Sequence, residues 1–159
     1  MKCSTCGYIE YENAYLMLYR DRKQHDVNHG KWIGVGGKFE HGETARQCMC
    51  REIKEESGLV FTEDELCFRG ILYFHYSKNE EEKIWIYTVT SYSKDVKDCD
   101  EGELAWVKKD QILDLPLWEG DSYFLMKMIR DDNAMFTLDL YYDDQGHLLH
   151  AKERTAENE

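Results

Sequence analysis

Gly37-Lys38-Phe39-Glu40-His41-Gly42-Glu43-Thr44, followed through Cys50 by Arg51-Glu52-Ile53-Lys54-Glu55-Glu56-Ser57-Gly58-Leu59, is the stretch that decides the fold of this chain. Its second half, Glu43–Ser57, contains no proline or glycine and is rich in good helix formers, which predicts a helix. Thr44 is a candidate N-terminal cap, with the acid Glu43 beside it, and Gly58 is placed to end the helix. The stretch therefore predicts a glycine-containing loop, a helix and a second loop.

Three carboxylates share one face of this expected helix. Glu52, Glu55 and Glu56 stand at positions i, i+3 and i+4, and glutamates at this spacing destabilise an isolated helix by ~0.2–0.5 kcal/mol. A divalent cation such as Mg²⁺ or Mn²⁺, which prefers oxygen ligands, would relieve the repulsion. A solvated acidic face is the alternative, but the glycines just before the helix place bare backbone beside the same residues.

The whole stretch resembles the Nudix box, G-x5-E-x7-R-E-U-x-E-E-x-G-U, in which U is aliphatic. Every specified position is matched, by Gly37, Glu43, Arg51, Glu52, Ile53, Glu55, Glu56, Gly58 and Leu59. The resemblance implies an α/β (or α+β) fold, an α/β/α sandwich with a mixed central sheet in which the box forms loop–helix–loop. It also implies hydrolysis of a nucleoside diphosphate that is linked to another group X.

The same resemblance implies roles for individual residues. Glu52, Glu55 and Glu56 would be metal ligands, one of them activating water, and the metal would be Mg²⁺ or Mn²⁺. Arg51 would orient these glutamates, Glu43 would support the loop, and the Gly36 carbonyl would complete the metal shell. Glu101 is similar to a distal glutamate of the family, and Glu103 is its nearest competitor.

Two further segments, 31–38 and 117–124, resemble the MutT-type members of the family that hydrolyse oxidised purine nucleotides. This resemblance implies that Trp118 stacks on the purine, that Asp121 binds the base edge and that Phe74 forms a pocket wall. Residues implied to border the substrate or its phosphates are Lys23, Val35, Gly36, Gly37 and Lys38. Alternatives are a core position for Trp118 and a helix-capping role for Asp121, and these can coexist with the functional roles.

Two positions depart from the MutT-type pattern. Mammalian-type members carry two adjacent acids after the tryptophan, where this chain has Gly120 before Asp121, and an asparagine where it has Ile33. The predicted activity is Mg²⁺-dependent hydrolysis of a nucleoside triphosphate to a monophosphate and pyrophosphate, with 8-oxo-dGTP as the expected substrate. This activity would serve DNA repair by sanitising the nucleotide pool. Alternatives are a diadenosine polyphosphate (Tyr76 has the spacing of a marker for these), an unmodified dNTP, or nucleotide binding without turnover.

The charge of the chain restricts the kinds of partner that it is expected to bind. The chain has 159 residues, 20 Lys+Arg against 32 Asp+Glu and a net charge of −12, which argues against binding duplex nucleic acid or an anionic membrane. We find no signal-like segment and no long apolar run, and we expect a cytoplasmic protein, monomer or homodimer, with reduced cysteines. Half of a zinc site, Cys3-x-x-Cys6, has no second pair at suitable spacing, so free thiols are the favoured interpretation.

We expect the rest of the chain to complete a single domain over residues 1–150, with a frayed polar tail over 151–159. The expected strands are a strand or hairpin over 8–19, strands over 69–77, 83–93 and 104–107, and a final pair over 135–142 and 147–149. Helical segments are expected over 109–113 and 122–130.

Overall fold

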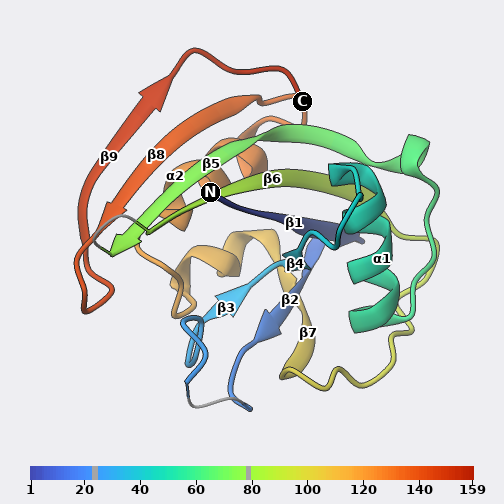
Figure 1. The fold of residues 1–159 in the computed structure, drawn as a ribbon. Helices are drawn as coiled ribbons and strands as arrows, with labels where there is room; N and C mark the ends of the chain where they lie inside the picture. Colours follow the sequence, from blue (N-terminus) through green and yellow to red (C-terminus); the bar gives the residue numbers. More distant parts are fainter. Residues whose placement is uncertain (23–24, 78–79) are drawn as a thin grey trace.

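The computed structural model describes residues 1–22, 25–77 and 80–159, and it contains one nine-stranded mixed sheet (Figure 1). The strands are β1 (Lys2–Tyr11), β2 (Ala14–Tyr19), β3 (Trp32–Ile33), β4 (Val35–Lys38), β5 (Cys67–Ser77), β6 (Glu80–Thr90), β7 (Glu103–Lys108), β8 (Phe136–Tyr142) and β9 (Leu148–Arg154). The helices are α1 (Ala45–Ser57) and α2 (Asp121–Arg130), with 3₁₀ turns η1 (Glu63–Glu65) and η2 (Lys109–Asp114).

The sheet divides at β1. One edge of β1 pairs in parallel with β6 along nearly its whole length, and the path continues through β5 and β8 to β9. The other edge is shared, because residues Ser4–Gly7 pair with β4 whereas Glu10 and Tyr11 pair with β2. β2 continues to β3 and also pairs with β7. The strand that carries the glycines, β4, therefore diverges from β2.

Side chains alternate between two cores on the two faces of this sheet. On β1, Tyr8 packs into a core with α2, whereas the next residue, Ile9, packs into a core with α1. Ile86 and Tyr87 of β6 divide between the same two cores. Figure 1 shows α1 and α2 on opposite sides of the strands. The expected α/β/α sandwich with a mixed sheet is confirmed.

α1 starts at Ala45, two residues later than the sequence indicated. Thr44 has extended backbone and forms a capping box with Gln47, so the helix cannot include Glu43. At the other end Gly58 adopts φ 82° and its N–H donates to the Lys54 carbonyl, as expected for a glycine that ends a helix. In the described part of the chain, no helix has the length and apolar character needed to cross a membrane.

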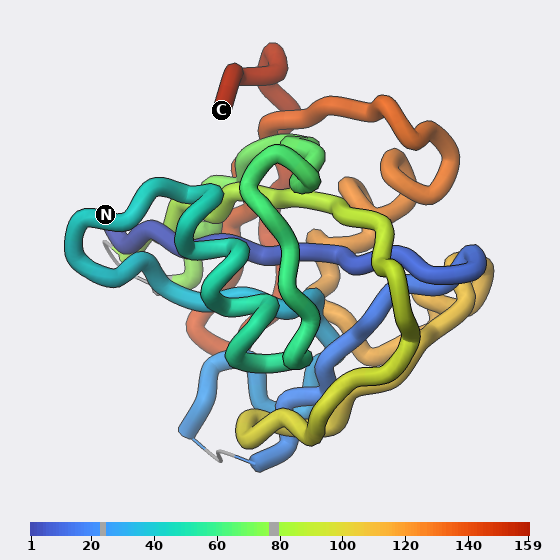
Figure 2. Tube along the Cα trace, turned by 90° about the vertical axis from the view of Figure 1, so that its right-hand side faces the viewer, coloured from blue at the N-terminus to red at the C-terminus, as the bar shows by residue number. Residues whose placement is uncertain are grey.

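The ends of the chain are more ordered than their sequence suggests. β1 begins at Lys2 rather than near Tyr8, because the parallel partner β6 supplies hydrogen bonds that local propensity does not reveal. β9 extends to Arg154, so Ala151 to Arg154 lie in the sheet, although we expected a frayed tail from Ala151 onwards. Beyond it, Glu159 pairs with Arg46 of α1 at 2.7 Å, and Figure 2 shows the C-terminus above α1.

Candidate active site

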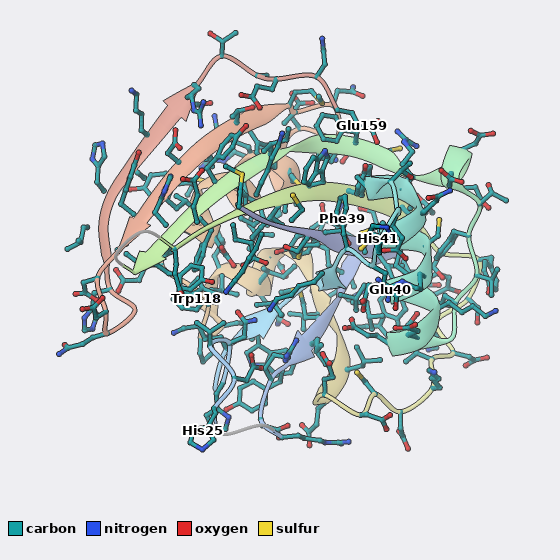
Figure 3. The ribbon with its side chains drawn as sticks, in the orientation of Figure 1. His25, Phe39, Glu40, His41, Trp118 and Glu159 are labelled. Atoms are coloured by element: carbon teal, nitrogen blue, oxygen red, sulfur yellow. The ribbon has the colours of Figure 1, made fainter. Side chains whose placement is uncertain are left out.

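A cavity of about 640 Å³ lies between the glycine strand β4, the acidic face of α1 and the segment before α2. Glu52, Glu55 and Glu101 line one end, and Phe74, Trp118 and Asp121 line the other. Figure 3 shows the same separation, with the lining residues Trp118 and Glu40 on opposite sides of β4. Carboxylates and aromatic rings therefore open onto one continuous space.

The two glycines of β4 allow its backbone to approach its neighbours. A β-carbon on Gly37 would lie 2.5 Å from Oε1 of Glu52, and one on Gly36 would lie 1.9 Å from the carbonyl oxygen of Thr5. Neither position accepts a side chain without a shift of the structure. Both glycines also line the cavity, so backbone without a side chain borders this space.

Arg51 organises the acidic end. Its guanidinium pairs with both carboxylate oxygens of Glu43 and donates to Oε1 of Glu52 at 2.8 Å and Oε2 of Glu55 at 3.2 Å. It also donates to the Lys38 carbonyl at 3.0 Å, which fixes the loop to the helix. Hydrogen bonding to Arg51 lowers the pKa of Glu43 to about 2. Arg51 therefore contacts two of the helix glutamates, and its pair with Glu43 joins the loop to the helix.

Glu56 is the most buried of the three helix glutamates, at 5% exposed. Burial, together with the charges of Glu52 and Glu101, raises the pKa of Glu56 to about 9. Burial also raises the pKa of Glu52. The Gly36 N–H donates to Oε2 of Glu56 at 3.0 Å, so it is the amide of Gly36 that contacts this glutamate. The acidic end therefore concentrates carboxylates that repel one another.

The donor set fits a divalent cation, although the side chains are turned toward protein partners. Within the ranges that the structure describes, no three His, Cys, Asp or Glu side chains are grouped as a bound metal would require. Glu52 and Glu55 contact Arg51, and Glu56 contacts Gly36. All the candidate ligands are oxygens, and burial together with the charges of Glu52 and Glu101 raises the pKa of Glu56, a charge balance that a cation would relieve. Glu52, Glu55, Glu56 and Glu101 are the carboxylates of this end that would hold a divalent cation.

Trp118 forms the aromatic end and also belongs to the core. It is 6% exposed, and its ring meets Phe74 edge-on, with 5.0 Å between ring centroids. The ammonium of Lys31 lies 4.8 Å from the ring centroid, and the indole Nε1 donates to Oδ1 of Asn28 at 2.8 Å. The core position and the cavity-lining position of Trp118 coexist, as the sequence allowed.

Asp121 is a buried acid at the same end of the cavity. It is 7% exposed, and burial raises its pKa to about 7. It is the first residue of α2 rather than the cap, because Gly120 occupies the N-cap position. A β-carbon on Gly120 would lie 2.7 Å from the hydroxyl of Tyr142, so a second acid does not fit there. The capping alternative for Asp121 is therefore wrong, and a cavity-lining role remains.

The remaining expected substrate residues are placed differently from one another. Lys38 is exposed and lines the cavity. Val35 is fully buried in the core under α1, and its side chain is not among the described residues that line the cavity. Lys23 lies outside the described residues. Cys3 and Cys6 are three residues apart on β1 and so face opposite sides of the sheet, which prevents them from sharing one zinc ion.

Sequence reasoning missed three residues of the site. Arg20 lines the cavity and pairs with Glu101 at 2.9 Å, Asn28 lines it and accepts from Trp118, and Lys31 lies over the Trp118 ring. All three belong to the polar segment between β2 and β3. No spacing rule distinguishes them from an ordinary solvated loop, so only the folded arrangement reveals them.

The family model for the NUDIX domain matches residues 7–128, and the chain belongs to the Nudix hydrolase family. It is 31% identical over 126 residues to an oxidized purine nucleoside triphosphate hydrolase of Danio rerio, covering 79% of this chain and 77% of that protein. It is 28% identical to the uncharacterized Nudix hydrolase YvcI of Bacillus subtilis, covering 80% and 78%. The crystal structure of a mutator MutT protein from Bacillus halodurans has the same fold, with a TM-score of 0.84, 23% identity and 96% and 97% coverage.

Proposed function

We propose that this Nudix hydrolase is a Mg²⁺-dependent nucleoside triphosphate pyrophosphohydrolase that acts on oxidised purine nucleotides, converting 8-oxo-dGTP to 8-oxo-dGMP and pyrophosphate. The observation that carries the proposal is one cavity that is lined by Glu52 and Glu55 of the box and also by Trp118 and Asp121. A planar base fits an aromatic wall, and a polyphosphate fits the end where carboxylates would hold a cation. The named relative from Danio rerio supports the same substrate class.

The residues of the chain have separable tasks in this reaction. When bound, Mg²⁺ would supply positive charge to the phosphates and lower the pKa of a water molecule. Arg51 holds Glu52 and Glu55 in fixed orientations through its guanidinium. Glu56, whose ionised form a bound cation would favour by offsetting the charges of Glu52 and Glu101, is the candidate to accept a proton from the attacking water. The close backbone of Gly36 and Gly37 leaves room for the phosphates.

Base recognition rests on a smaller polar set than in mammalian-type relatives. Asp121 lines the cavity after Trp118, whereas Glu119 is not among the described lining residues and a side chain on Gly120 would collide with Tyr142. An Asp121 carboxyl with a pKa near 7 is able to donate as well as accept a hydrogen bond at neutral pH. Ile33 gives the wall an apolar contact in place of an amide. These features favour purines but loosen the discrimination between oxidised and unmodified bases, so hydrolysis of unmodified purine dNTPs is the second candidate.

A substrate panel tests the proposal. Purified protein with Mg²⁺ is assayed against 8-oxo-dGTP, dGTP, dATP, a diadenosine polyphosphate and ADP-ribose, and kcat/KM is compared. We expect the largest value for 8-oxo-dGTP, the monophosphate and pyrophosphate as products, and no turnover in EDTA. A dominant diadenosine polyphosphate or ADP-ribose activity would contradict the substrate assignment. Tight nucleotide binding without product over hours would indicate a binding module instead.

A further inference from the structure

We propose that Arg20, Asp26 and Asn28 are positioning residues that join Glu101, at the acidic end of the cavity, to Trp118 at the aromatic end. The inference rests on the proposed function and adds residues outside the box to it. The chain of contacts runs Trp118–Asn28–Asp26–Arg20–Glu101, and each link is a direct polar contact. Three of its five members, Arg20, Asp26 and Asn28, lie in the segment that links β2 to β3, and the sequence motifs include none of them.

The first link fixes the distal glutamate. Nη1 of Arg20 lies 2.9 Å from Oε2 of Glu101, whose side chain is 33% exposed. The side chain of Arg20 is only 13% exposed, so this ion pair is largely shielded from solvent. The charges of Glu101 and Arg20 both act on Glu56, in opposite directions. Arg20 therefore holds Glu101 near Glu56 while offsetting part of their repulsion.

The second link connects Arg20 to the loop. Nε of Arg20 lies 2.7 Å from Oδ2 of Asp26, whose side chain is 10% exposed. The other oxygen of Asp26 accepts from the backbone N–H of Asn28 at 3.2 Å. One carboxylate thus faces the arginine and the Asn28 backbone at once. Two of these groups are shielded side chains, so their geometry is restricted to a few rotamers.

The third link fixes the aromatic wall. Oδ1 of Asn28 accepts from the indole Nε1 of Trp118 at 2.8 Å, which sets the orientation of the ring plane. The loop itself is closed by backbone bonds, because the Arg20 N–H donates to the Lys31 carbonyl at 3.0 Å and the Gly30 N–H donates to the Arg20 carbonyl at 2.7 Å. Arg20 and Lys31 therefore form the base of a loop whose side chains reach both ends of the cavity.

Because Arg20 and Asn28 contact different ends of the cavity, their loss should change different kinetic constants. Loss of Arg20 misplaces Glu101, so it lowers kcat and metal affinity, whereas loss of the Asn28 acceptor misplaces Trp118 and raises KM for a purine substrate. Partners that orient metal ligands typically change metal affinity or activity by about 10–100-fold when removed. Asp26 contacts both sides, so its loss changes both parameters.

A double-mutant cycle tests the first link. We expect Arg20→Met to lower kcat about 10–100-fold with KM little changed, and Arg20→Lys to restore part of the loss because it keeps the charge. In an Arg20→Met/Glu101→Gln double variant we expect no further loss beyond Glu101→Gln alone, because Arg20 acts through that glutamate. Additive losses would overturn the assignment. Arg130→Met, at an exposed arginine of α2, is the matched control and should leave both constants unchanged.

The second test uses a substrate without a base. Asn28→Leu removes the acceptor for Trp118, and we expect KM for the preferred purine triphosphate to rise about 10-fold, the effect typical of one lost hydrogen bond to a fixed group. Hydrolysis of inorganic tripolyphosphate should be unchanged in the same variant, whereas Asn28→Asp, which keeps the acceptor oxygen, should behave like the parent protein. An equal loss on tripolyphosphate would show that Asn28 only supports the fold.

A measurement of metal affinity tests the role of Arg20 independently of nucleotide hydrolysis. Mn²⁺ affinity is measured by isothermal titration calorimetry without nucleotide, and we expect a decrease of about 10-fold for Arg20→Met and none for Arg130→Met. If the parent protein hydrolyses no triphosphate, the proposed function fails, yet the Mn²⁺ comparison still decides the role of Arg20. Unchanged Mn²⁺ affinity in Arg20→Met and Arg20→Lys, with thermal unfolding showing both folded, would overturn it.

Discussion

The acidic end and the aromatic end of the cavity are built in different ways. Glu52, Glu55 and Glu56 come from one helix, in which Arg51 joins Glu52 and Glu55 to the preceding loop, whereas Glu101 comes from the segment before β7. The aromatic end takes Asn28, Phe74, and the neighbouring Trp118 and Asp121 from three separate segments. In the proposed reaction, the chemistry would thus depend mainly on one local unit, and recognition of a base would depend on long-range packing.

This difference teaches where the site tolerates change. At the acidic end a β-carbon on Gly36 would collide with the Thr5 backbone, and Arg51 makes contacts with several acceptors, so these positions are constrained together. At the aromatic end Ile33 and Gly120 already depart from the pattern of mammalian-type relatives while Trp118 and Asp121 remain. A conserved reaction combined with variable substrates is the expected outcome of such a construction.

Loss of Glu56 would be the most damaging test of the acidic end. We expect Glu56→Gln to lower kcat/KM by about 10³-fold, within the range for a lost general base, with little change in KM. The variant should fold, because glutamine resembles the protonated form that burial favours. Steady-state kinetics provide the measurement, with Glu63→Gln, an exposed acid outside the cavity, as the control. If Glu56→Gln keeps more than a tenth of the parent activity, Glu56 is not the general base.

A matched pair of tryptophan changes tests the aromatic end. Stacking of a base on an aromatic ring is worth about 1–3 kcal/mol, and phenylalanine keeps part of it, so we expect Trp118→Phe to raise KM for 8-oxo-dGTP about 5–10-fold with kcat less affected. Trp106→Phe makes the same chemical change on β7, where the indole donates to the Lys94 carbonyl. Equal effects of the two changes on KM would mean that Trp118 serves only as a core residue.

The raised pKa of Asp121 predicts that the stability of the folded protein depends on pH. Its folded pKa of about 7 lies above its ordinary value of 3.8, so between these values the folded state holds a proton that the unfolded state has lost. This contribution is complete below pH ~4 and is lost as pH rises through ~7. We expect the decrease in Tm between pH 5 and pH 8 to be smaller in Asp121→Asn by at least about 2 °C. The same decrease in both proteins, followed by circular dichroism, would contradict burial of a titrating carboxyl.

The smallest effect on stability and activity is expected for a substitution at the C-terminus, far from both ends of the cavity. Glu159 pairs with Arg46 at 2.7 Å and joins the C-terminus to α1, but both side chains are about one-third exposed. We expect Glu159→Ala to lower the free energy of unfolding by less than about 1 kcal/mol and to leave kcat/KM unchanged. Urea unfolding and the standard assay measure the two quantities. A large loss of activity would show that the tail positions α1 for catalysis.

The fold was predictable where local signals agree with tertiary partners. The hairpin between β1 and β2 turns at Glu12 and Asn13, which adopt positive φ, and the aromatic pattern of 8–19 indicated it. Helix α1 was delimited to within two residues by Thr44 and Gly58. The start of β1 at Lys2 and the extension of β9 to Arg154 were not visible, because each depends on a neighbouring strand that is distant in sequence.

By itself the sequence determined the family, the loop–helix–loop unit and the shared face of Glu52, Glu55 and Glu56, because helix periodicity and the spacing of glycines are local properties. Tertiary structure decided the burial of Glu56, the absence of space at Gly120 and the placement of Val35 in the core. It also brought Arg20 and Asn28 between the two ends of the cavity. Burial and contact between distant segments arise only when the sheet assembles, so no spacing rule along the chain contains them.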